Sequence, residues 1–337
     1  MRYIDSTARP GTVRKIVHAV ESSNQAGLRL NLVEKQGEGD AANPKPPVLC
    51  VHGATLAGYI WDIPVPNMSF LDHFAQAGHR SFALDIRGYA GSASVAALDA
   101  AGAPDKPYGR AEEAILDIDD AIDFIREETG FDTICLVGSS WGTVTTALYC
   151  TGPGAAKVDR LVLAAPLFSA RNEAWLEMIR DPENHDRPNP ALGPYRLVSR
   201  KEVEERWDAE IPGPDKTIWR DPAVFDALIK DAVSEGLPGT NPESQVFCAP
   251  NGTLIDLFEV FSERPLYDPA ALTLPVLLIR GDADPTSTHA DASNLFDRIA
   301  SPIKRYTVIG NGAHFLVAEV NNWQMFHEIE CFFAFGD

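Results

Sequence analysis

Short runs of mainly apolar residues alternate along the chain with longer segments in which apolar residues recur every three or four positions. The short runs cover residues 48–51, 81–84, 134–137, 161–164, 276–279 and 306–309. Such alternation is typical of strands and helices that form a mainly parallel sheet. Two further segments, 13–21 and 28–34, flank a turn-prone sequence and predict an antiparallel pair. The pattern therefore predicts an α/β fold with an eight-stranded, mostly parallel sheet flanked by helices.

Helices are expected between these strands. The segment Ala111 to Glu128 places Ala114, Ile118 and Ile125 on one face and ends before Gly130, a common helix terminator. The same period and flanking residues predict further helices at 70–77, 143–150, 289–299 and 322–333. Each predicted strand can thus be covered by a neighbouring amphipathic helix.

One connection is too long to be a simple crossover. Roughly a hundred residues lie between Pro166 and Pro275, whereas a crossover needs a dozen or two. Within this stretch, helices are expected near 172–180, 199–208, 221–234 and 254–262. We therefore expect a core made of residues 1–166 and 275–337, interrupted by a helical cap at 167–274 that covers one edge of the sheet.

Composition and charge narrow the range of partners. The 337 residues include 29 Lys and Arg against 48 Asp and Glu, a formal net charge of −19, so we expect neither nucleic acid nor an anionic membrane surface as a partner. No apolar run is long enough for a membrane span, and Met1 to Ser6 do not begin a signal peptide. The five cysteines are widely spaced and are expected to be reduced. These features together predict a cytoplasmic location.

The segment Gly138-Ser139-Ser140-Trp141-Gly142 lies between a predicted strand and a predicted helix. A G-x-S-x-G sequence in that context is typical of a nucleophile elbow. The turn is so tight that small residues are needed two positions before and two positions after its central serine. It would lift the Ser140 hydroxyl above the carboxyl ends of the strands, near backbone N–H groups that favour a developing oxyanion. Ser139 is off-centre and has no expected role.

A serine nucleophile needs a histidine base, and the histidine needs a carboxylate to hold its tautomer. Asp282 and Asp284 follow one predicted strand, and His314 follows the next. All three therefore belong to loops at the same end of the sheet as Ser140. Their order along the chain is the one expected for this elbow.

Together these motifs resemble the α/β-hydrolase superfamily with a helical cap, from about Val48 to the C-terminus. Val51-His52-Gly53-Ala54 resembles the family's H-G-x oxyanion loop. Residues 85–92 resemble its D-x-R-G-x-G-x-S loop, with Ala90 either inserted or replacing the usual glycine.

The resemblance implies a role for each residue that matches a family motif. Ser140 would be the nucleophile and His314 the base. The family's G-x-x-D spacing selects Asp284, rather than Asp282, as the acid that orients the histidine. The remaining roles implied are backbone N–H donors of the oxyanion hole for Ala54 and Trp141, with Thr55 as an alternative to Ala54, and a structural role for His52.

The ordered Ser, Asp and His beneath a cap predict a carboxylesterase-like hydrolase that cleaves a small or medium ester through an acyl-enzyme on Ser140. No cofactor is expected, because the chain has neither a G-x-G-x-x-G sequence after a strand nor a P-loop. A metal site is also not expected. Its best ligands, Asp282, Asp284, His289 and Asp291, lack a recognised metal-binding spacing.

Other functions use the same residues. The segment Gly138 to Thr143 is similar to the elbow of proline iminopeptidases, although His52 to Leu56 lacks their H-G-G-P-G loop. Such an aminopeptidase would need cap carboxylates, for which Glu204, Glu205 and Asp208 are available. An acyltransferase, a carbon–carbon bond hydrolase or a receptor on the same fold are further alternatives. Six cap arginines could hold an anionic group of the substrate or pair with surface acids: Arg171, Arg180, Arg187, Arg196, Arg200 and Arg206.

Overall fold

The computed structural model describes residues 13–37, 45–94 and 106–334, so the expectation drawn from Met1 to Ser6 lies outside the described residues. The strands are β1 (Val13–Glu21), β2 (Arg29–Gly37), β3 (Lys45–Val51), β4 (His79–Leu84), β5 (Ile134–Ser139), β6 (Val158–Ala164), β7 (Tyr195–Ser199), β8 (Val246–Pro250), β9 (Val276–Gly281) and β10 (Lys304–Ile309). The α-helices are α1 (Phe70–Gln76), α3 (Ala111–Thr129), α4 (Trp141–Cys150), α5 (Glu173–Ile179), α6 (Arg200–Glu210), α7 (Pro222–Ala232), α8 (Gly252–Phe261), α9 (His289–Arg298) and α10 (Asn322–Phe333).

Eight of these strands form one sheet, in the order β1-β2-β4-β3-β5-β6-β9-β10. Strand β2 is antiparallel to both of its neighbours, and the other neighbouring pairs are parallel. The predicted eight-stranded, mostly parallel sheet is thus confirmed, together with its antiparallel first pair. Because the central strands are parallel, the loops that follow β5, β9 and β10 emerge at the same end.

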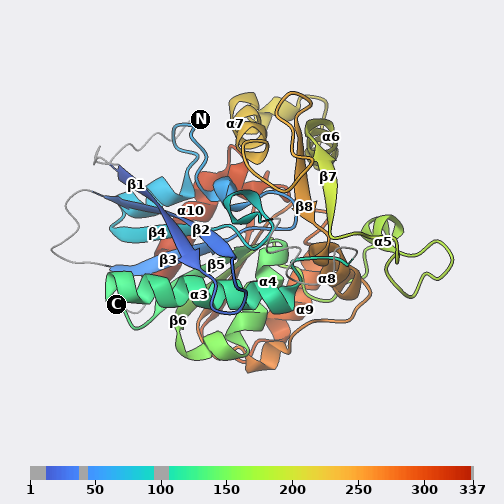
Figure 1. The fold of residues 1–337 in the computed structure, drawn as a ribbon. Helices are drawn as coiled ribbons and strands as arrows, with labels where there is room; N and C mark the ends of the chain where they lie inside the picture. Colours follow the sequence, from blue (N-terminus) through green and yellow to red (C-terminus); the bar gives the residue numbers. More distant parts are fainter. Residues whose placement is uncertain (1–12, 38–44, 95–105, 335–337) are drawn as a thin grey trace.

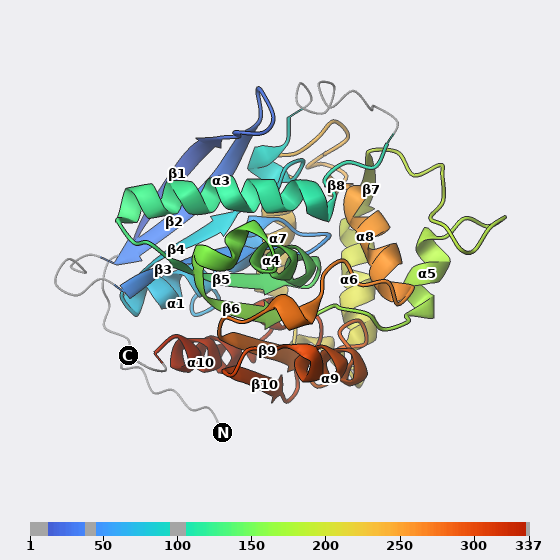
Figure 2. The same ribbon diagram turned by 90° about the horizontal axis from the view of Figure 1, so that it is seen from below.

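Helices cover both faces of the sheet (Figures 1 and 2). Helices α3 and α4 pack against each other on one face, and α1 contacts α10 on the other. Phe70 of α1 meets Phe326 of α10 edge to face, with ring centroids 5.2 Å apart. The apolar face predicted for α3 is buried, including Ala114, Ile118 and Ile125. The core therefore lies in two layers, one on each side of the sheet.

The central strand β3 has two prolines directly after its first residue, and proline lacks the N–H that a sheet ladder needs. Its pairing with β4 shifts register between Lys45 and Val48, which is where Pro46 and Pro47 stand. The regular parallel pairing with β5 starts at Val48. This register shift allows a strand with prolines near its start to occupy the middle of the sheet.

The helices of residues 167–274, which we call the cap segment, lie beyond the carboxyl ends of the parallel strands, and the end of the segment returns to the start of β9 (Figure 2). All four helices expected there are present, as α5 to α8. The segment also contains a two-stranded antiparallel sheet, β7 with β8, which the sequence pattern did not predict. Each strand has only five residues, and its partner lies more than forty residues away, so no local pattern marks the pair. Within the described ranges, no helix is long and apolar enough to cross a membrane.

Candidate active site

The elbow forms a sharp turn between β5 and α4. Ser140 stands at the N-cap of α4 with φ of 55°, a left-handed conformation that is uncommon for a residue other than glycine. A Cβ added at Gly138 would lie 2.4 Å from the carbonyl oxygen of Gly142, and one added at Gly142 would lie 2.5 Å from that of His52. Only glycine fits at these two positions, so the strained turn is fixed by its neighbours.

Ser140, His314 and Asp284 form one hydrogen-bonded chain. The Nε2 atom of His314 lies 2.8 Å from Ser140 Oγ, and its Nδ1 atom lies 2.9 Å from Asp284 Oδ2. The Oδ1 atom of Asp284 also accepts hydrogen bonds from the backbone N–H groups of Thr286 and Ser287, both at 2.8 Å. Asp284 is completely buried and His314 nearly so. The carboxylate is therefore locked in place with both oxygens facing Nδ1 of the imidazole, since Oδ1 also lies 3.0 Å from it.

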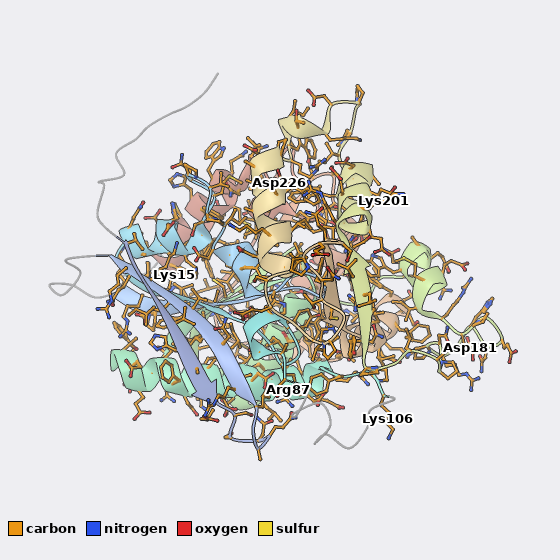
Figure 3. The ribbon with its side chains drawn as sticks, turned by 45° about the horizontal axis from the view of Figure 1, so that its top comes forward. Lys15, Arg87, Lys106, Asp181, Lys201 and Asp226 are labelled. Carbon is orange, nitrogen blue, oxygen red and sulfur yellow. The ribbon has the colours of Figure 1, made fainter. Side chains whose placement is uncertain are left out.

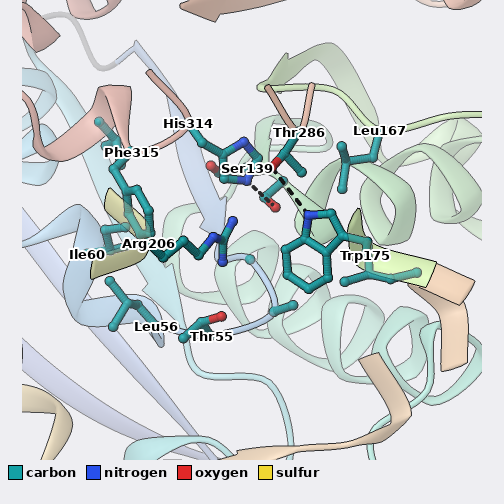
Figure 4. A pocket seen from close by; sticks show the side chains of 15 residues that line it. Thr55, Leu56, Ile60, Ser139, Leu167, Trp175, Arg206, Thr286, His314 and Phe315 are labelled. Atoms are coloured by element: carbon teal, nitrogen blue, oxygen red, sulfur yellow. Dashed lines mark hydrogen bonds between the residues drawn. The ribbon is translucent and has the colours of Figure 1, made fainter. Parts of the chain in front are cut away.

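The chain of three opens into a partly open cavity. Figure 4 shows His314, Thr286 and Trp175 around it, with Arg206 reaching in from α6. Most of its remaining wall is apolar: Leu56, Ile60, Leu167, Leu257, Phe315 and Val317. A second and larger cavity under the cap segment shares Thr55, Trp175, Arg206, Thr286 and Phe315 with the first. The Ser140 hydroxyl is thus reached through a space bounded by the cap segment.

Comparison with known proteins agrees with this geometry. A family model described as the alpha/beta hydrolase fold matches residues 46–319. The chain belongs to the α/β-hydrolase family. No curated protein matches it in sequence.

Solved structures similar to this α/β hydrolase have different activities. The chain aligns with a bromoperoxidase from Bacillus anthracis at 19% identity and a TM-score of 0.62, covering 95% of this chain and 99% of the other. An esterase from Exiguobacterium antarcticum aligns at 15% identity and a TM-score of 0.59, covering 94% of this chain and 98% of the other. A 2-hydroxy-6-oxo-6-phenylhexa-2,4-dienoate hydrolase from Rhodococcus sp. strain RHA1 aligns at 15% identity and a TM-score of 0.59, covering 96% of this chain and 100% of the other. At such low identity these likenesses show the fold alone.

The loop that follows β3 in this α/β hydrolase carries Ala54, which lines the smaller cavity together with Thr55. The carbonyl oxygen of Ala54 accepts hydrogen bonds from Tyr89 Oη at 2.8 Å and from Arg196 Nη2 at 2.7 Å. The N–H of Ser140 donates to Ala164 and is already used. The N–H of Trp141, the first residue of α4, is one of the unpaired donors of a helix start. The oxyanion-hole role of Ala54 and Trp141, with Thr55 as the alternative, stays a prediction.

His52 is fully buried behind this loop. Its Nε2 atom accepts a hydrogen bond from the N–H of Ile86 at 3.1 Å, so Nδ1 carries the proton and donates to the carbonyl of Gly53 at 2.7 Å. Burial lowers the pKa of His52 to about 4. A neutral histidine that bridges two loops is structural, as the family resemblance implies.

The loop after β4 shows how the family motif is altered in this chain. Arg87 forms a buried ion pair with Asp117 of α3 at 2.6 Å, and Asp85 accepts a hydrogen bond from the N–H of Gly58 at 2.7 Å. Ala90, rather than Gly91, has a positive φ, of 36°. Alanine therefore replaces the motif's glycine at the position that needs a left-handed backbone.

The residues considered as an alternative acid or as metal ligands each make contacts of their own. Asp282 is exposed, and its Oδ1 accepts a hydrogen bond from the N–H of Gly312 at 3.2 Å. Asp291 accepts from the N–H groups of residues 168 and 169, while His289 bonds to Tyr306 Oη. Within the described part of the chain, one cluster has groups close enough to hold an ion: His73, His327 and Glu330. It belongs to α1 and α10, not to the site around Ser140.

The carboxylates that an aminopeptidase would need are mostly engaged elsewhere. Asp208 and Glu204 both contact Arg220, at 2.9 and 3.3 Å. Glu205 lines the larger cavity and pairs with Lys201 at 3.5 Å. Lys201 extends outward from α6 (Figure 3). No pair of these acids converges on Ser140.

Sequence reasoning missed a buried acid beside the active site. Glu319 is fully buried; its carboxyl oxygens accept hydrogen bonds from Ala313 N–H at 2.8 Å and from Trp207 Nε1 at 2.9 Å. It thereby ties the loop that holds His314 to α6. Burial raises the pKa of Glu319 to about 8. The available signal was an acid directly after four apolar residues, Phe315 to Ala318.

A second missed acid, Asp256 of α8, lies behind the elbow. Its Oδ2 atom accepts hydrogen bonds from Trp141 Nε1 at 3.1 Å and from Ala111 N–H at 2.7 Å, and Oδ1 pairs with Arg110 at 2.5 Å. Burial raises the pKa of this carboxyl above its usual value. The cap segment is therefore anchored to Trp141, which follows Ser140, and to the start of α3.

Proposed function

We propose that this α/β hydrolase is a serine esterase that cleaves a small or medium carboxylic ester through an acyl-enzyme on Ser140. The observation that carries the proposal is the unbroken hydrogen-bonded chain from Asp284 through His314 to Ser140 at the wall of a cavity. An esterase is among the solved structures of the same fold. The mostly apolar wall and the limited volume of the cavity favour a compact organic acyl group over a polymer.

The reaction follows from the geometry. As Ser140 Oγ attacks the ester carbonyl, His314 Nε2 takes its proton, and the proton is then given to the departing alcohol. Asp284 holds Nδ1–H and stabilises the imidazolium that forms. Backbone N–H groups at the start of α4 and in the loop after β3 would receive the developing oxyanion. Water activated by His314 then releases the acid and regenerates the serine.

The test compares wild type with Ser140→Ala on p-nitrophenyl esters of increasing acyl length, beside aminoacyl anilides. We expect ester turnover by wild type and a loss of about 10⁴-fold or more in the variant, because no other group supplies the nucleophile. Ser139→Ala is the matched control, since it alters the same turn but leaves the hydrogen-bonded chain intact, and we expect it to keep most of the turnover.

Other outcomes would point elsewhere. Cleavage of anilides but not of esters would favour the aminopeptidase. Ester turnover that survives in Ser140→Ala would contradict the proposed nucleophile. Product analysis with an added alcohol or amine separates an acyltransferase from a hydrolase, because a transferase discharges the acyl group to the acceptor in preference to water.

A further inference from the structure

The six cap arginines that could hold an anionic group are used in different ways. Four of them pair with acids: Arg171 with Glu173, Arg180 with Glu173 and Glu177, Arg187 with Asp181, and Arg200 with Asp226. Arg196 lines the larger cavity, but it donates to the carbonyl oxygens of Ala54 and Pro250, at 2.7 and 2.8 Å. Its guanidinium is therefore committed to joining the cap segment to the loop after β3.

The guanidinium of Arg206 is not committed in this way. Its ion pair among the described residues is with Glu210, where Nε lies 3.6 Å from Oε1, beyond hydrogen-bond distance. No hydrogen bond within the described part of the chain uses any of its five N–H donors. A half-buried guanidinium with its donors unused has capacity left for an acceptor that enters from the cavity.

The position of Arg206 is fixed by two aromatic rings. Its guanidinium carbon lies 4.8 Å from the centre of the Trp175 ring and 5.2 Å from that of Phe315. Both distances are within the range of cation–π attraction. Figure 4 shows the side chain extended into the pocket, with its end between Trp175 and Phe315. These two contacts restrict the guanidinium to a position inside the pocket.

Arg206 also stands between the two cavities. It lines the smaller one together with Ser140 and His314, and it lines the larger one under the cap segment. A ligand that contacts Arg206 while its carbonyl lies at Ser140 must therefore be short. Glu210 also lines the larger cavity, but it is absent from the lining of the smaller one, and its Oε2 accepts a hydrogen bond from the N–H of His314 at 3.1 Å.

Building on the proposed esterase function, we propose that Arg206 binds a free carboxylate of the substrate, so that the preferred substrates are half-esters of short dicarboxylic acids. The flat guanidinium presents paired N–H donors that match the two oxygens of a carboxylate, and arginine stays charged even where burial is unfavourable. The apolar wall of the smaller cavity accommodates the methylene chain between the carboxylate and the ester.

The first experiment compares monoethyl glutarate with its neutral isostere, in which an amide replaces the carboxylic acid. We expect wild type to favour the half-ester in kcat/KM by about 10- to 100-fold, the range for a hydrogen bond to a charged group. Arg206→Gln should bring this ratio close to one, and Arg206→Lys should keep part of it, because lysine keeps the charge but loses the fork. Arg171→Gln is the control, since Arg171 is exposed and lines neither cavity, and it should keep the wild-type ratio.

A second measurement separates the two proposals. Binding of monoethyl glutarate is followed by calorimetry in Ser140→Ala and in Ser140→Ala with Arg206→Gln. Binding that is lost in the double variant, without turnover of any ester by wild type, would support the carboxylate site and overturn the esterase. Ester turnover by wild type without preference for the half-ester, or an unchanged preference in Arg206→Gln, would overturn the carboxylate site and leave the esterase standing.

Discussion

At the scale of single residues, the motifs predicted which three groups come together, but the groups that shape their surroundings had to be seen in space. Ser140, Asp284 and His314 each follow a strand, and parallel strands bring such loops to one end of the sheet. Arg206 and Glu319 carry no such mark, because a charged residue on a helix or beyond a loop is usually solvated. Glu319 is buried and Arg206 half-buried because the cap segment packs against the core, and this contact between distant segments cannot be predicted from local sequence.

Ala90 allows a prediction at this scale. Its φ of 36° is a left-handed conformation that costs alanine about 1–2 kcal/mol and glycine little. We expect Ala90→Gly to stabilise the folded state by up to about 1 kcal/mol, after the greater flexibility of glycine in the unfolded chain is subtracted. Urea unfolding of the two proteins measures the change. A lower midpoint for the variant would mean that the methyl group contributes more by packing than the strained backbone costs.

At the scale of elements, the periodicity of apolar residues predicted the helices and the strands of the main sheet. It missed strands whose formation depends on a partner far away along the chain. All eight strands of the main sheet and the nine α-helices within the described ranges lie where the pattern predicts them, apart from a few residues at their ends. Strands β7 and β8 were missed, since five-residue strands are defined by a partner distant along the chain. Helix α4 begins at Trp141 rather than at 143, because the elbow turns directly into the helix.

Glu319 links two elements, and its protonation should therefore control how firmly they are joined. Burial raises its folded-state pKa to about 8, above the value of about 4.3 expected in an unfolded chain. Between these values the folded protein holds a proton that the unfolded chain has released. Raising the pH through this window therefore destabilises the folded state through this group.

Glu319→Gln removes this titration. We expect the free energy of unfolding of wild type, relative to that of the variant, to fall as the pH rises from 5 to 8. Urea unfolding of both proteins at several pH values measures the difference, and comparing across pH cancels the constant cost of replacing a hydrogen-bond acceptor. A difference that stays flat from pH 5 to 8 would mean that Glu319 is already ionised in the folded protein, held so by Ala313 N–H and Trp207 Nε1.

At the scale of the whole molecule, the fold and the substrate-binding region have different origins in the sequence. The sheet follows from repeated local patterns, whereas the cavity exists because α5, α6 and α8 of the cap segment lie over the ends of the strands. Asp256 and Arg196 join the cap segment to the elbow and to the loop after β3. These hydrogen bonds connect the cap segment directly to the loops around Ser140. A change in the cap segment can therefore alter the site without touching Ser140.

The net charge of −19 gives the last prediction. Anions exceed cations so far that mutual repulsion acts against the compact state, and salt screens this repulsion. Salt also weakens surface ion pairs, but each of these is worth at most about 1 kcal/mol, and buried pairs such as Arg87 with Asp117 are screened little. Repulsion should therefore dominate, and we expect the melting temperature to rise by a few degrees between about 10 and 200 mM NaCl. Choline chloride should give the same rise if ionic strength is the cause; a fall in both salts would mean that the surface pairs outweigh the repulsion.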